Sequence, residues 1–238
     1  GHSKWNNIKR RKGAEDAKRA KIFTKLGREI QVAVREGGAD PEFNAKLAAV
    51  IDRAKSANVP NDNIERSIKR GLGEGDGADI EEIIYEGYGP GGVAIMVRCL
   101  SDNRNRTAGD IRHLFDRNGG NLGTSGCVSF MFNTVGSFFI RPGDRDLDTL
   151  LDLILEGGAD DLELVDTDDD EEIYEVTCEP QVYHQLSNYL KEHDVEIVES
   201  SLEPTPENYV TVDDPETAAK VETLIEDLED SDDVQDVY

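Results

Sequence analysis

The glycine-rich segment Gly71–Gly77 (GLGEGDG) divides the chain into two kinds of hydrophobic pattern. Before this segment, apolar residues recur every three or four positions, which is typical of amphipathic helices. After it, short apolar runs bounded by glycine and proline predict strands that alternate with helices. A polar, glycine-rich stretch between two such patterns is typical of a linker. The sequence therefore predicts a helical domain over residues 1–77, followed by α/β structure.

Three helices are predicted in residues 1–77. The first spans 14–36 and ends at Gly37, because glycine commonly terminates helices. The second spans 44–57, and the third begins at the capping residue Asn61 and ends where the linker starts. Helices joined by such short connections pack as a small three-helix domain.

The whole chain has 238 residues, more than the roughly 150 of an average domain, so more than one domain is expected. The part after the linker is long enough for two α/β domains. Residues 134–204 predict the ferredoxin-like order of strand, helix, strand, strand, helix and strand. Residues 78–133 supply two strands, a helix and a strand, and residues 205–238 add a strand, a helix and a strand. We therefore expect an α+β protein of three domains, in which 134–204 is inserted into a second ferredoxin-like α/β domain built from 78–133 and 205–238.

The individual elements follow from the same patterns. Strands are expected at 80–88, 93–100, 127–132, 136–141, 162–166, 173–178, 195–202, 209–212 and 234–237. Helices are expected from the capping residue Thr107 to the glycines at 119–120, and at 147–156, 181–193 and 215–228. The stretch Gly87–Gly92 matches G-x-G-x-x-G, but it lies between two predicted strands and so predicts a hairpin turn instead of a dinucleotide site.

The charge of the chain is distributed unevenly. The whole sequence carries a formal net charge of −25, which favours solubility. Residues 1–77, however, hold 17 Lys and Arg against 11 Asp and Glu, and residues 1–35 hold 11 against 3. Residues 78–238 hold the other 9 Lys and Arg against 40 Asp and Glu. A basic end on an acidic protein points to contact with nucleic acid or with a membrane surface.

The first predicted helix carries its positive charge on one face. At about 100° per residue, a set of its cations falls within an arc of about 100°: Lys18, Lys21, Lys25, Arg28 and Arg35. The apolar residues lie nearly opposite, so the helix can pack on its neighbours while it presents these cations. We expect them to contact phosphates of a nucleic acid; an ordinary solvated helix face and an anionic membrane surface are the alternatives.

The arm before this helix extends the predicted basic surface. The predicted nucleic-acid-binding residues are Lys4, Trp5, Lys9, Arg10, Arg11, Lys12, Lys18, Lys21, Lys25 and Arg28. Contacts of this kind position a protein on nucleic acid without reading its sequence. Trp5 fits two roles: it can stack on a base, or it can anchor the arm to the helical core.

A second group of basic residues stands out because Lys and Arg are rare after residue 78. The group consists of Arg104, Arg106, Arg112 and Arg117. Three aspartates lie among them, so pairing within the protein competes with contact to a nucleic acid: Asp102, Asp110 and Asp116. We take Arg104, Arg106 and Arg112 as a second candidate contact.

The sequence holds no motif for catalysis or cofactor binding. It has no G-x-x-x-x-G-K-[ST] loop, no G-x-S-x-G elbow and no H-E-x-x-H motif. The three cysteines are scattered and fit buried, reduced side chains better than a metal or redox site. No apolar run of about 18 residues and no signal peptide is visible. We therefore expect a non-enzymatic, cytoplasmic protein without cofactor, metal, small-molecule substrate or membrane partner.

Several long segments, spread over essentially the whole chain, form specific motifs. They are HSKWNNIK, KIFTKLGREI, GGADPEFNAKL, NIERSIKRG, YEGYGPGGVAIMV, NRNRTAGDIRHLF, GCVSFMF, DLED and VQDVY. Together they resemble the YebC/PmpR family. The resemblance implies a helical N-terminal domain and two α/β domains, one inserted in the other.

The resemblance also implies two mechanisms. Bacterial members of the family are described as DNA-binding transcriptional regulators. A mitochondrial relative is a translational activator, and bacterial relatives are linked to the rescue of ribosomes stalled at proline-rich sequences. On the ribosomal mechanism, the segment Gly123–Phe132, including Met131, is a candidate for reaching the peptidyl-transferase region.

Three functions are consistent with these observations. The chain is a DNA-binding regulator of transcription, a ribosome-associated translation factor that binds rRNA, or a scaffold that binds proteins through its acidic surface. No helix-turn-helix signature is legible, so sequence-specific reading of bases has no support. We expect a non-enzymatic nucleic-acid-binding regulator of gene expression, with the ribosome-associated factor as the alternative.

Overall fold

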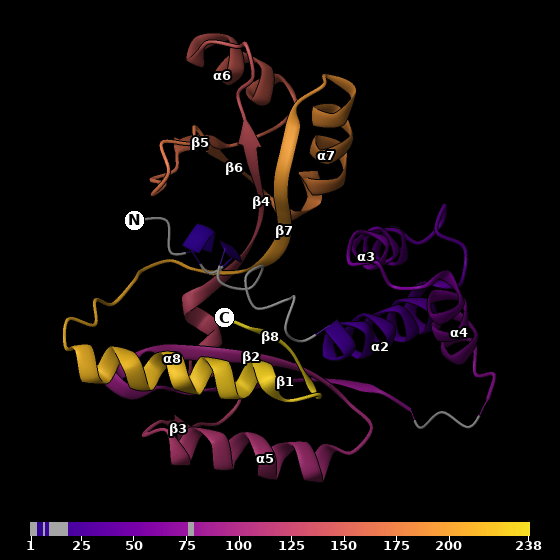
Figure 1. Ribbon diagram of the computed structural model, residues 1–238, viewed down its shortest axis with the longest axis vertical. Coiled ribbons are helices and arrows are strands. Elements are labelled where there is room, and N and C mark those ends of the chain that lie inside the picture. The colour runs from indigo at the N-terminus through magenta and orange to yellow at the C-terminus, as the bar shows by residue number, and fades with distance from the viewer. Residues whose placement is uncertain (1–3, 7, 10–18, 76–78) are drawn as a thin grey trace. The chain divides into compact units, whose positions relative to one another are not determined.

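The computed structural model describes residues 4–6, 8–9, 19–75 and 79–238 (Figure 1). Its helices are α2 (Arg19–Gly37), α3 (Ala45–Ser56), α4 (Asn61–Gly71), α5 (Arg104–Arg117), α6 (Leu147–Glu156), α7 (Tyr183–Glu192) and α8 (Pro215–Asp230). Its strands are β1 (Glu81–Tyr88), β2 (Ala94–Ser101), β3 (Asn121–Leu122), β4 (Phe132–Arg141), β5 (Asp161–Leu164), β6 (Tyr174–Cys178), β7 (Glu196–Pro206) and β8 (Val234–Val237). The predicted α+β fold class is confirmed.

The described residues group into two compact units. The first contains the described part of 1–13 together with 131–209, and the second contains the described part of 14–130 together with 210–238. Each unit holds one four-stranded antiparallel sheet, and the second also holds the N-terminal helices. The domain boundaries proposed after residues 77, 133 and 204 stay a prediction.

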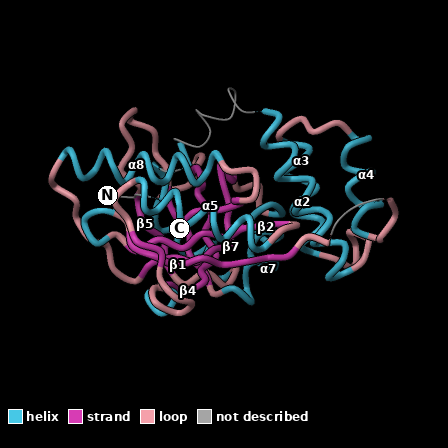
Figure 2. The backbone as a smooth tube through the Cα atoms, turned by 90° about the horizontal axis from the view of Figure 1, so that it is seen from below, coloured by secondary structure: helices cyan, strands magenta, loops and turns pink. Residues whose placement is uncertain are grey.

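The second unit begins with α2, α3 and α4, which lie next to one another (Figure 2). Leu26 and Ile30 of α2 pack with Leu47 of α3 in a shared core. Asn44 caps α3, since its Oδ1 accepts the N–H of Leu47 at 3.1 Å. The same side chain donates from Nδ2 to the Ala33 carbonyl at 2.8 Å and thereby ties α3 to α2. The predicted three-helix region is thus confirmed for the described residues.

The sheet of the second unit has the order β3-β1-β2-β8. β1 and β2 form an antiparallel hairpin that is paired along its whole length. In the connecting turn, Gly91 and Gly92 have φ angles of 74° and 77°, a left-handed conformation that glycine adopts without strain. The predicted hairpin turn is therefore confirmed. Phe115 of α5 and Leu224 of α8 are fully buried with Val97 on one face of this sheet.

The first unit has a sheet in the order β5-β6-β4-β7. With α6 after β4 and α7 after β6, this is the predicted ferredoxin-like arrangement. In the other sheet the hairpin strands β1 and β2 occupy the centre, and the strands that follow helices take the two edges. The helix side of the β5-β6-β4-β7 sheet buries Phe138 and Val176, while Phe139 packs on the opposite side.

One predicted strand at the C-terminal side of β7 does not form. Residues 209–212 have no strand partner, and Tyr209 and Val210 are 65% and 60% exposed. The apolar and polar residues alternate there without a sheet edge to pair with, so the segment is a loop that leads into α8.

A second predicted strand, 127–132, is also corrected. Residues 127–131 form a turn and a short 3₁₀ helix, and β4 begins only at Phe132. Backbone N–H groups of this segment donate to the buried carboxylate of Glu86, so they are not free to pair with a neighbouring strand. The third strand of this sheet is instead β3, which is only two residues long.

Helix α5 begins at Arg104, before the predicted start at Thr107. Its cap is Asn103, whose Oδ1 accepts the N–H of Arg106 at 3.0 Å. Thr107 lies inside the helix and is fully buried. Its hydroxyl donates to Asp233 Oδ2 at 2.8 Å, so this threonine has a tertiary partner instead of a capping role.

Candidate nucleic-acid interface

Trp5 of the N-terminal arm is packed inside the first unit. Its side chain is 4% exposed, and its ring centroid lies 5.1 Å from that of Phe139. Ile8 and Ile173 complete this small apolar cluster on the side of the sheet opposite α6 and α7. Of the two roles expected for Trp5, the geometry corresponds to anchoring. The anchor point is the β4–β7 sheet, not the three-helix core.

The described cations of the arm lie near acidic side chains of the same unit. Lys4 Nζ is 3.6 Å from Glu203 Oε1, and Lys9 Nζ is 3.6 Å from Asp169 Oδ1. The side chains of Lys4 and Glu203 are each 15% exposed, whereas those of Lys9 and Asp169 are 39% and 57% exposed. An exposed ion pair of this kind contributes little, and the ammonium of Lys9 also lies 5.8 Å from the centroid of the Trp5 ring.

The basic face of α2 contacts the C-terminal end of α8. Lys21 Nζ donates to the Asp230 carbonyl at 2.7 Å, and Lys25 Nζ donates to the Glu229 carbonyl. The last turn of α8 has no basic residue of its own. The unpaired carbonyls and partial negative charge of a helix C-terminus are stabilised by cations. Lys21 and Lys25 therefore cap α8.

Lys25 is partly desolvated where it contacts the end of α8. Burial lowers the pKa of its ammonium, and the carboxylates of Glu229 and Asp236 act in the opposite direction. A cation that is largely removed from water and hydrogen-bonded to a carbonyl is poorly placed to meet a phosphate in solution.

Arg28, the next cation along α2, is held by the segment between α8 and β8. Its Nη1 donates to Asp233 Oδ1 at 2.9 Å, to the Asp232 carbonyl at 3.0 Å and to the Leu100 carbonyl at 3.1 Å. The side chain remains 20% exposed. Arg28 therefore joins α2 to the β1–β2–β8 sheet and still reaches the surface with part of its guanidinium.

The second predicted cluster is divided by the structure. Arg104 Nε lies 3.2 Å from Glu81 Oε2, and Arg106 Nη2 donates to Asp102 at 2.9 Å and to both oxygens of Asp233 at 3.1 Å. Arg112 is exposed and forms no ion pair with any residue that the structure describes. Arg117, the fourth arginine of the group, lies 3.9 Å from Asp227 Oδ2, so within the described chain three of the four are paired and Arg112 is free.

Met131 begins the second segment of the first unit, 131–209, and is half-buried. Its backbone carbonyl accepts the N–H of Glu207 at 3.0 Å. In the second unit, the side chain of the preceding Phe130 is 72% exposed. The most accessible apolar side chain of the segment Gly123–Phe132 is therefore Phe130, which the sequence did not single out.

Four predicted contact residues lie outside the residues that the structure describes. They are Arg10, Arg11, Lys12 and Lys18.

Helix α4 carries three cations that the sequence analysis passed over. Arg66, Lys69 and Arg70 are exposed, and none of them forms an ion pair within the described chain. Asp62 and Glu65 on the same helix mask the local excess of positive charge when residues are counted along the sequence. The signal that could have found them is spacing, since Arg66 and Arg70 are four residues apart and share one face of the helix.

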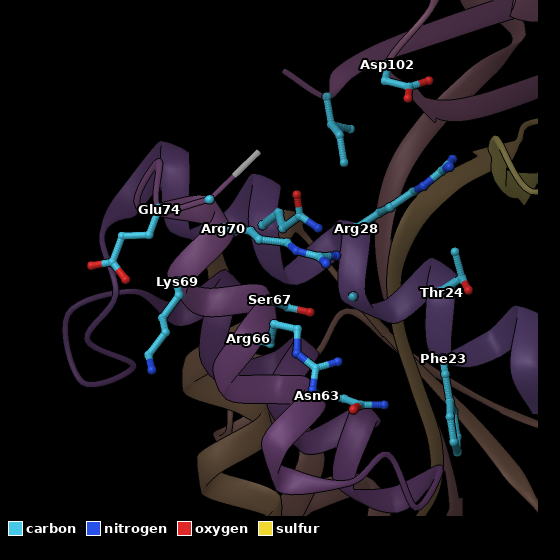
Figure 3. Close-up of a pocket in the computed structure, with 14 residues that line it drawn as sticks. Phe23, Thr24, Arg28, Asn63, Arg66, Ser67, Lys69, Arg70, Glu74 and Asp102 are labelled. Atoms are coloured by element: carbon cyan, nitrogen blue, oxygen red, sulfur yellow. The ribbon is translucent and has the colours of Figure 1, made fainter. Parts of the chain in front are cut away.

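Arg66 and Arg70 point from α4 into a cleft between α4 and α2 (Figure 3). The cleft has a volume of about 760 Å³. Lys69 and Glu74 point to its outer side (Figure 3). At the bottom of the cleft α2 and α4 approach each other closely, because the residues in contact there are small. A Cβ on Gly27 would lie only 3.0 Å from Ser67 Oγ.

Two polar side chains inside the cleft have no hydrogen-bond partner in the described part of the protein. Gln31 is 9% exposed and Ser67 is 8% exposed, and both line the cleft. The fully enclosed side-chain atoms without a partner in the described protein belong to other residues, so water in the cleft can reach the polar atoms of Gln31 and Ser67. The cleft therefore combines guanidinium groups with polar groups whose hydrogen bonds a ligand can take over from water.

Two of the three cysteines are unreactive, and the described residues hold no metal site. Burial raises the pKa of the Cys99 thiol to about 12 and that of Cys178 to about 11, so both are protonated and unreactive at neutral pH. Across the described ranges, no three His, Cys, Asp or Glu side chains lie in an arrangement that could hold a metal ion. The helices that the structure describes are all too short or too polar to traverse a lipid bilayer.

Two family models match the chain. Residues 3–74 match the model described as the TACO1/YebC protein N-terminal domain. Residues 80–238 match the model described as the TACO1/YebC second and third domain. The interval between the two matches, 75–79, falls at the end of the glycine-rich segment.

Curated relatives match over nearly their whole length. A probable transcriptional regulatory protein of Persephonella marina is 50% identical, with 100% of this chain and 94% of the relative covered. A protein of the same description from Ruminiclostridium cellulolyticum is 53% identical, with 97% and 91% covered. The probable transcriptional regulatory protein YrbC of Bacillus subtilis is 49% identical, with 100% and 97% covered.

A solved structure shares the fold. The crystal structure of a conserved hypothetical protein from Aquifex aeolicus matches with a TM-score of 0.81 and 44% sequence identity. The match covers 94% of this chain and 90% of that one. Given these matches over the full length, the chain belongs to the TACO1/YebC family.

Proposed function

We propose that this protein is a non-enzymatic, cytoplasmic regulator of gene expression that acts by binding nucleic acid through its N-terminal helices. One observation carries the proposal. Arg66, Lys69 and Arg70 on α4 are exposed cations without an acidic partner in the described chain, although the protein as a whole has a net charge of −25. The names of the relatives, probable transcriptional regulatory proteins, support a regulatory role.

The contact surface in this proposal is shifted from the one that the sequence predicts. Lys21 and Lys25 of α2 are engaged with the end of α8, so within the cleft α2 contributes the exposed part of Arg28. Arg66 and Arg70 lie on the same cleft as Arg28. Arginine suits phosphate because its planar guanidinium can donate two parallel hydrogen bonds to the oxygens. The described arm cation Lys9 can add a peripheral contact.

A ribosome-associated translation factor is the second candidate. Arg28, Arg66 and Arg70 line a cleft between two helices, whereas duplex DNA is read by side chains on an element that enters its groove. Recessed cations suit irregular RNA, whose backbone and unpaired bases protrude. This observation favours rRNA over an operator in duplex DNA.

Crosslinking in cells, followed by sequencing of the bound nucleic acid, tests the proposal and separates the two targets. We expect the wild-type protein to retrieve discrete rRNA segments or promoter DNA, and the variant Arg66→Glu/Arg70→Glu to lose most of that signal. The matched control is Lys46→Glu/Lys55→Glu on α3, which changes the net charge equally away from the cleft. Equal recovery by both variants, or no enrichment of nucleic acid by the wild type, would refute the proposal.

A further inference from the structure

The size of the cleft between α2 and α4 sets what it can hold. A volume of about 760 Å³ lies within the range of about 300–1,000 Å³ that is typical of small-ligand pockets. The cleft exists because Gly27 and Ser67 bring the two helices close together at its floor, while Arg66 and Arg70 rise from its wall. Such a space accepts a nucleotide or a short piece of backbone, whereas a double helix would only rest on its rim.

The lining of the cleft is chemically mixed. Arg66, Arg70 and the exposed part of Arg28 supply positive charge, and Asp102 and Glu74 supply carboxylates near the margin. A surface that tracked only a phosphate backbone would gain nothing from these carboxylates, because they repel it. A carboxylate does, however, accept hydrogen bonds from the amino groups of bases.

The amide of Gln31 in the cleft also favours a base as the ligand. The Gln31 side chain is 9% exposed and has no hydrogen-bond partner among the described residues, and Asn63 supplies a second amide to the lining. An amide offers two donors and an acceptor, which match the hydrogen-bonding edge of a base. An amide can also read the major-groove edge of a paired base, but Gln31 and Asn63 line a cleft that a double helix does not enter, so a base must be unpaired to reach them.

We propose that the cleft between α2 and α4 binds an unpaired nucleotide of a single-stranded nucleic acid. The phosphate lies on Arg66 and Arg70, and the base lies toward Gln31. This inference rests on the proposed nucleic-acid function and adds the form of the ligand. It covers single-stranded RNA and single-stranded DNA, which share this chemistry, and the test separates them.

Fluorescence anisotropy with labelled oligonucleotides of one mixed sequence tests the inference. The probes are the single-stranded RNA, the single-stranded DNA of the same sequence and the duplex of each. We expect the full-length protein to bind a single strand more tightly than either duplex. The variant Arg66→Gln/Arg70→Gln should lose roughly tenfold in affinity for the single strand, and the slope of log affinity against log salt should fall by about 1.4 for two lost phosphate contacts.

The variant Gln31→Met supplies a second, independent readout. It keeps the length of the side chain but removes the amide, so affinity for the single strand should fall roughly threefold to tenfold with an unchanged salt slope. Because the amide has no partner within the described protein, the midpoint of denaturant unfolding should not fall. The control Lys46→Gln/Lys55→Gln should leave binding within about twofold of the wild type.

Different outcomes reject different statements. Equal or tighter binding of the duplexes, or single-strand binding that both cleft variants leave unchanged, overturns the cleft inference while the proposed function stands. If no probe binds to the wild type at any salt concentration, the cleft inference is overturned. If the wild type also enriches no nucleic acid in the cellular crosslinking experiment, the proposed function is overturned as well.

Discussion

Arg28 of α2 and Asp233 of the segment before β8 form an ion pair of 2.9 Å between residues that lie 205 positions apart in the chain. Asp233 is 5% exposed and also accepts hydrogen bonds from Arg106 and from Thr107. One buried carboxylate thus joins α2, α5 and the C-terminal strand within the second unit. The cation of α2 that the sequence assigns to phosphate is, in the folded protein, part of this junction.

Replacement of Asp233 by alanine should destabilise the second unit strongly. The substitution leaves the partly buried Arg28 and the buried Thr107 without their shared acceptor, and removing one member of such a network costs about 3–5 kcal/mol. Denaturant unfolding monitored by circular dichroism measures the loss. The control is Asp232→Ala, whose exposed side chain acts within the described protein only through its charge on Lys25. Equal effects of the two substitutions would contradict the assignment.

Glu86 should stabilise the segment that leads to Phe130. Its carboxylate, 4% exposed, accepts the N–H groups of Gly126 at 2.6 Å, Val128 at 3.2 Å and Ser129 at 2.6 Å. In Glu86→Gln, an NH₂ group replaces one oxygen and faces a backbone donor, which costs about 1–3 kcal/mol for a buried group left unpaired.

Hydrogen exchange locates the Glu86 effect. We expect faster exchange at the amides of residues 126–129 in Glu86→Gln, together with a lower free energy of unfolding. The control is Glu81→Gln on the same strand, where the exposed pair with Arg104 contributes at most about 1 kcal/mol. Unchanged exchange at 126–129 would show that the carboxylate does not hold this segment.

Stability should fall at acidic pH through these same two carboxylates. Burial by itself raises the pKa of Glu86 and of Asp233, but hydrogen bonds from the backbone at 126–129 and from Arg28, Thr107 and Arg106 outweigh it, so both pKa values lie below their ordinary range. A carboxyl with a lowered folded-state pKa stabilises the protein fully above its unfolded pKa of about 4. That contribution disappears as pH falls through the folded-state pKa.

The pH dependence can be measured by denaturant unfolding between pH 7 and pH 2.5. Above about pH 5, the difference in free energy of unfolding between wild type and Glu86→Gln should be constant, because the carboxyl is ionised in both the folded and the unfolded wild-type chain. Below about pH 4 this difference in free energy of unfolding should become smaller, because Glu86 becomes protonated in the wild type. A difference that stays constant down to the lowest pH would mean that the Glu86 proton is not linked to folding.

The elements of the fold could be predicted to the extent that their signals are local. Helix α6 has the predicted bounds 147–156, because Asp146 caps it and the apolar period is clear. The strand predicted at 127–132 failed because a carboxylate more than forty residues earlier in the chain takes its N–H groups. No local pattern records such a partner.

The candidate site was harder to predict for the same reason. The charge of Lys21 is visible in the sequence, but its acceptor, the Asp230 carbonyl, lies 209 residues away and depends on tertiary packing. Arg66 and Arg70 share a helix with acidic residues, so composition hid them, and the floor of their cleft is set by the approach of Gly27 to Ser67 on another helix. Charge counting identifies residues 1–77 as the basic part of the chain, but it does not tell which of their cations are paired in the folded protein.

Trp5 offers a direct test of anchoring against base stacking, because it is the single tryptophan of the chain. Buried beside Phe139, it should emit at short wavelength, resist quenching by acrylamide and keep its emission when a single-stranded oligonucleotide saturates the protein. Quenching by the oligonucleotide would instead indicate that the indole stacks on a base.

Trp5→Ala should free the arm and speed tryptic cleavage at Lys9, and the emptied site should lower the free energy of unfolding by about 3–5 kcal/mol. The indole N–H has no partner in the described protein, so Trp5→Phe should retain most of the protection, and the exposed Asn6→Ala should retain all of it.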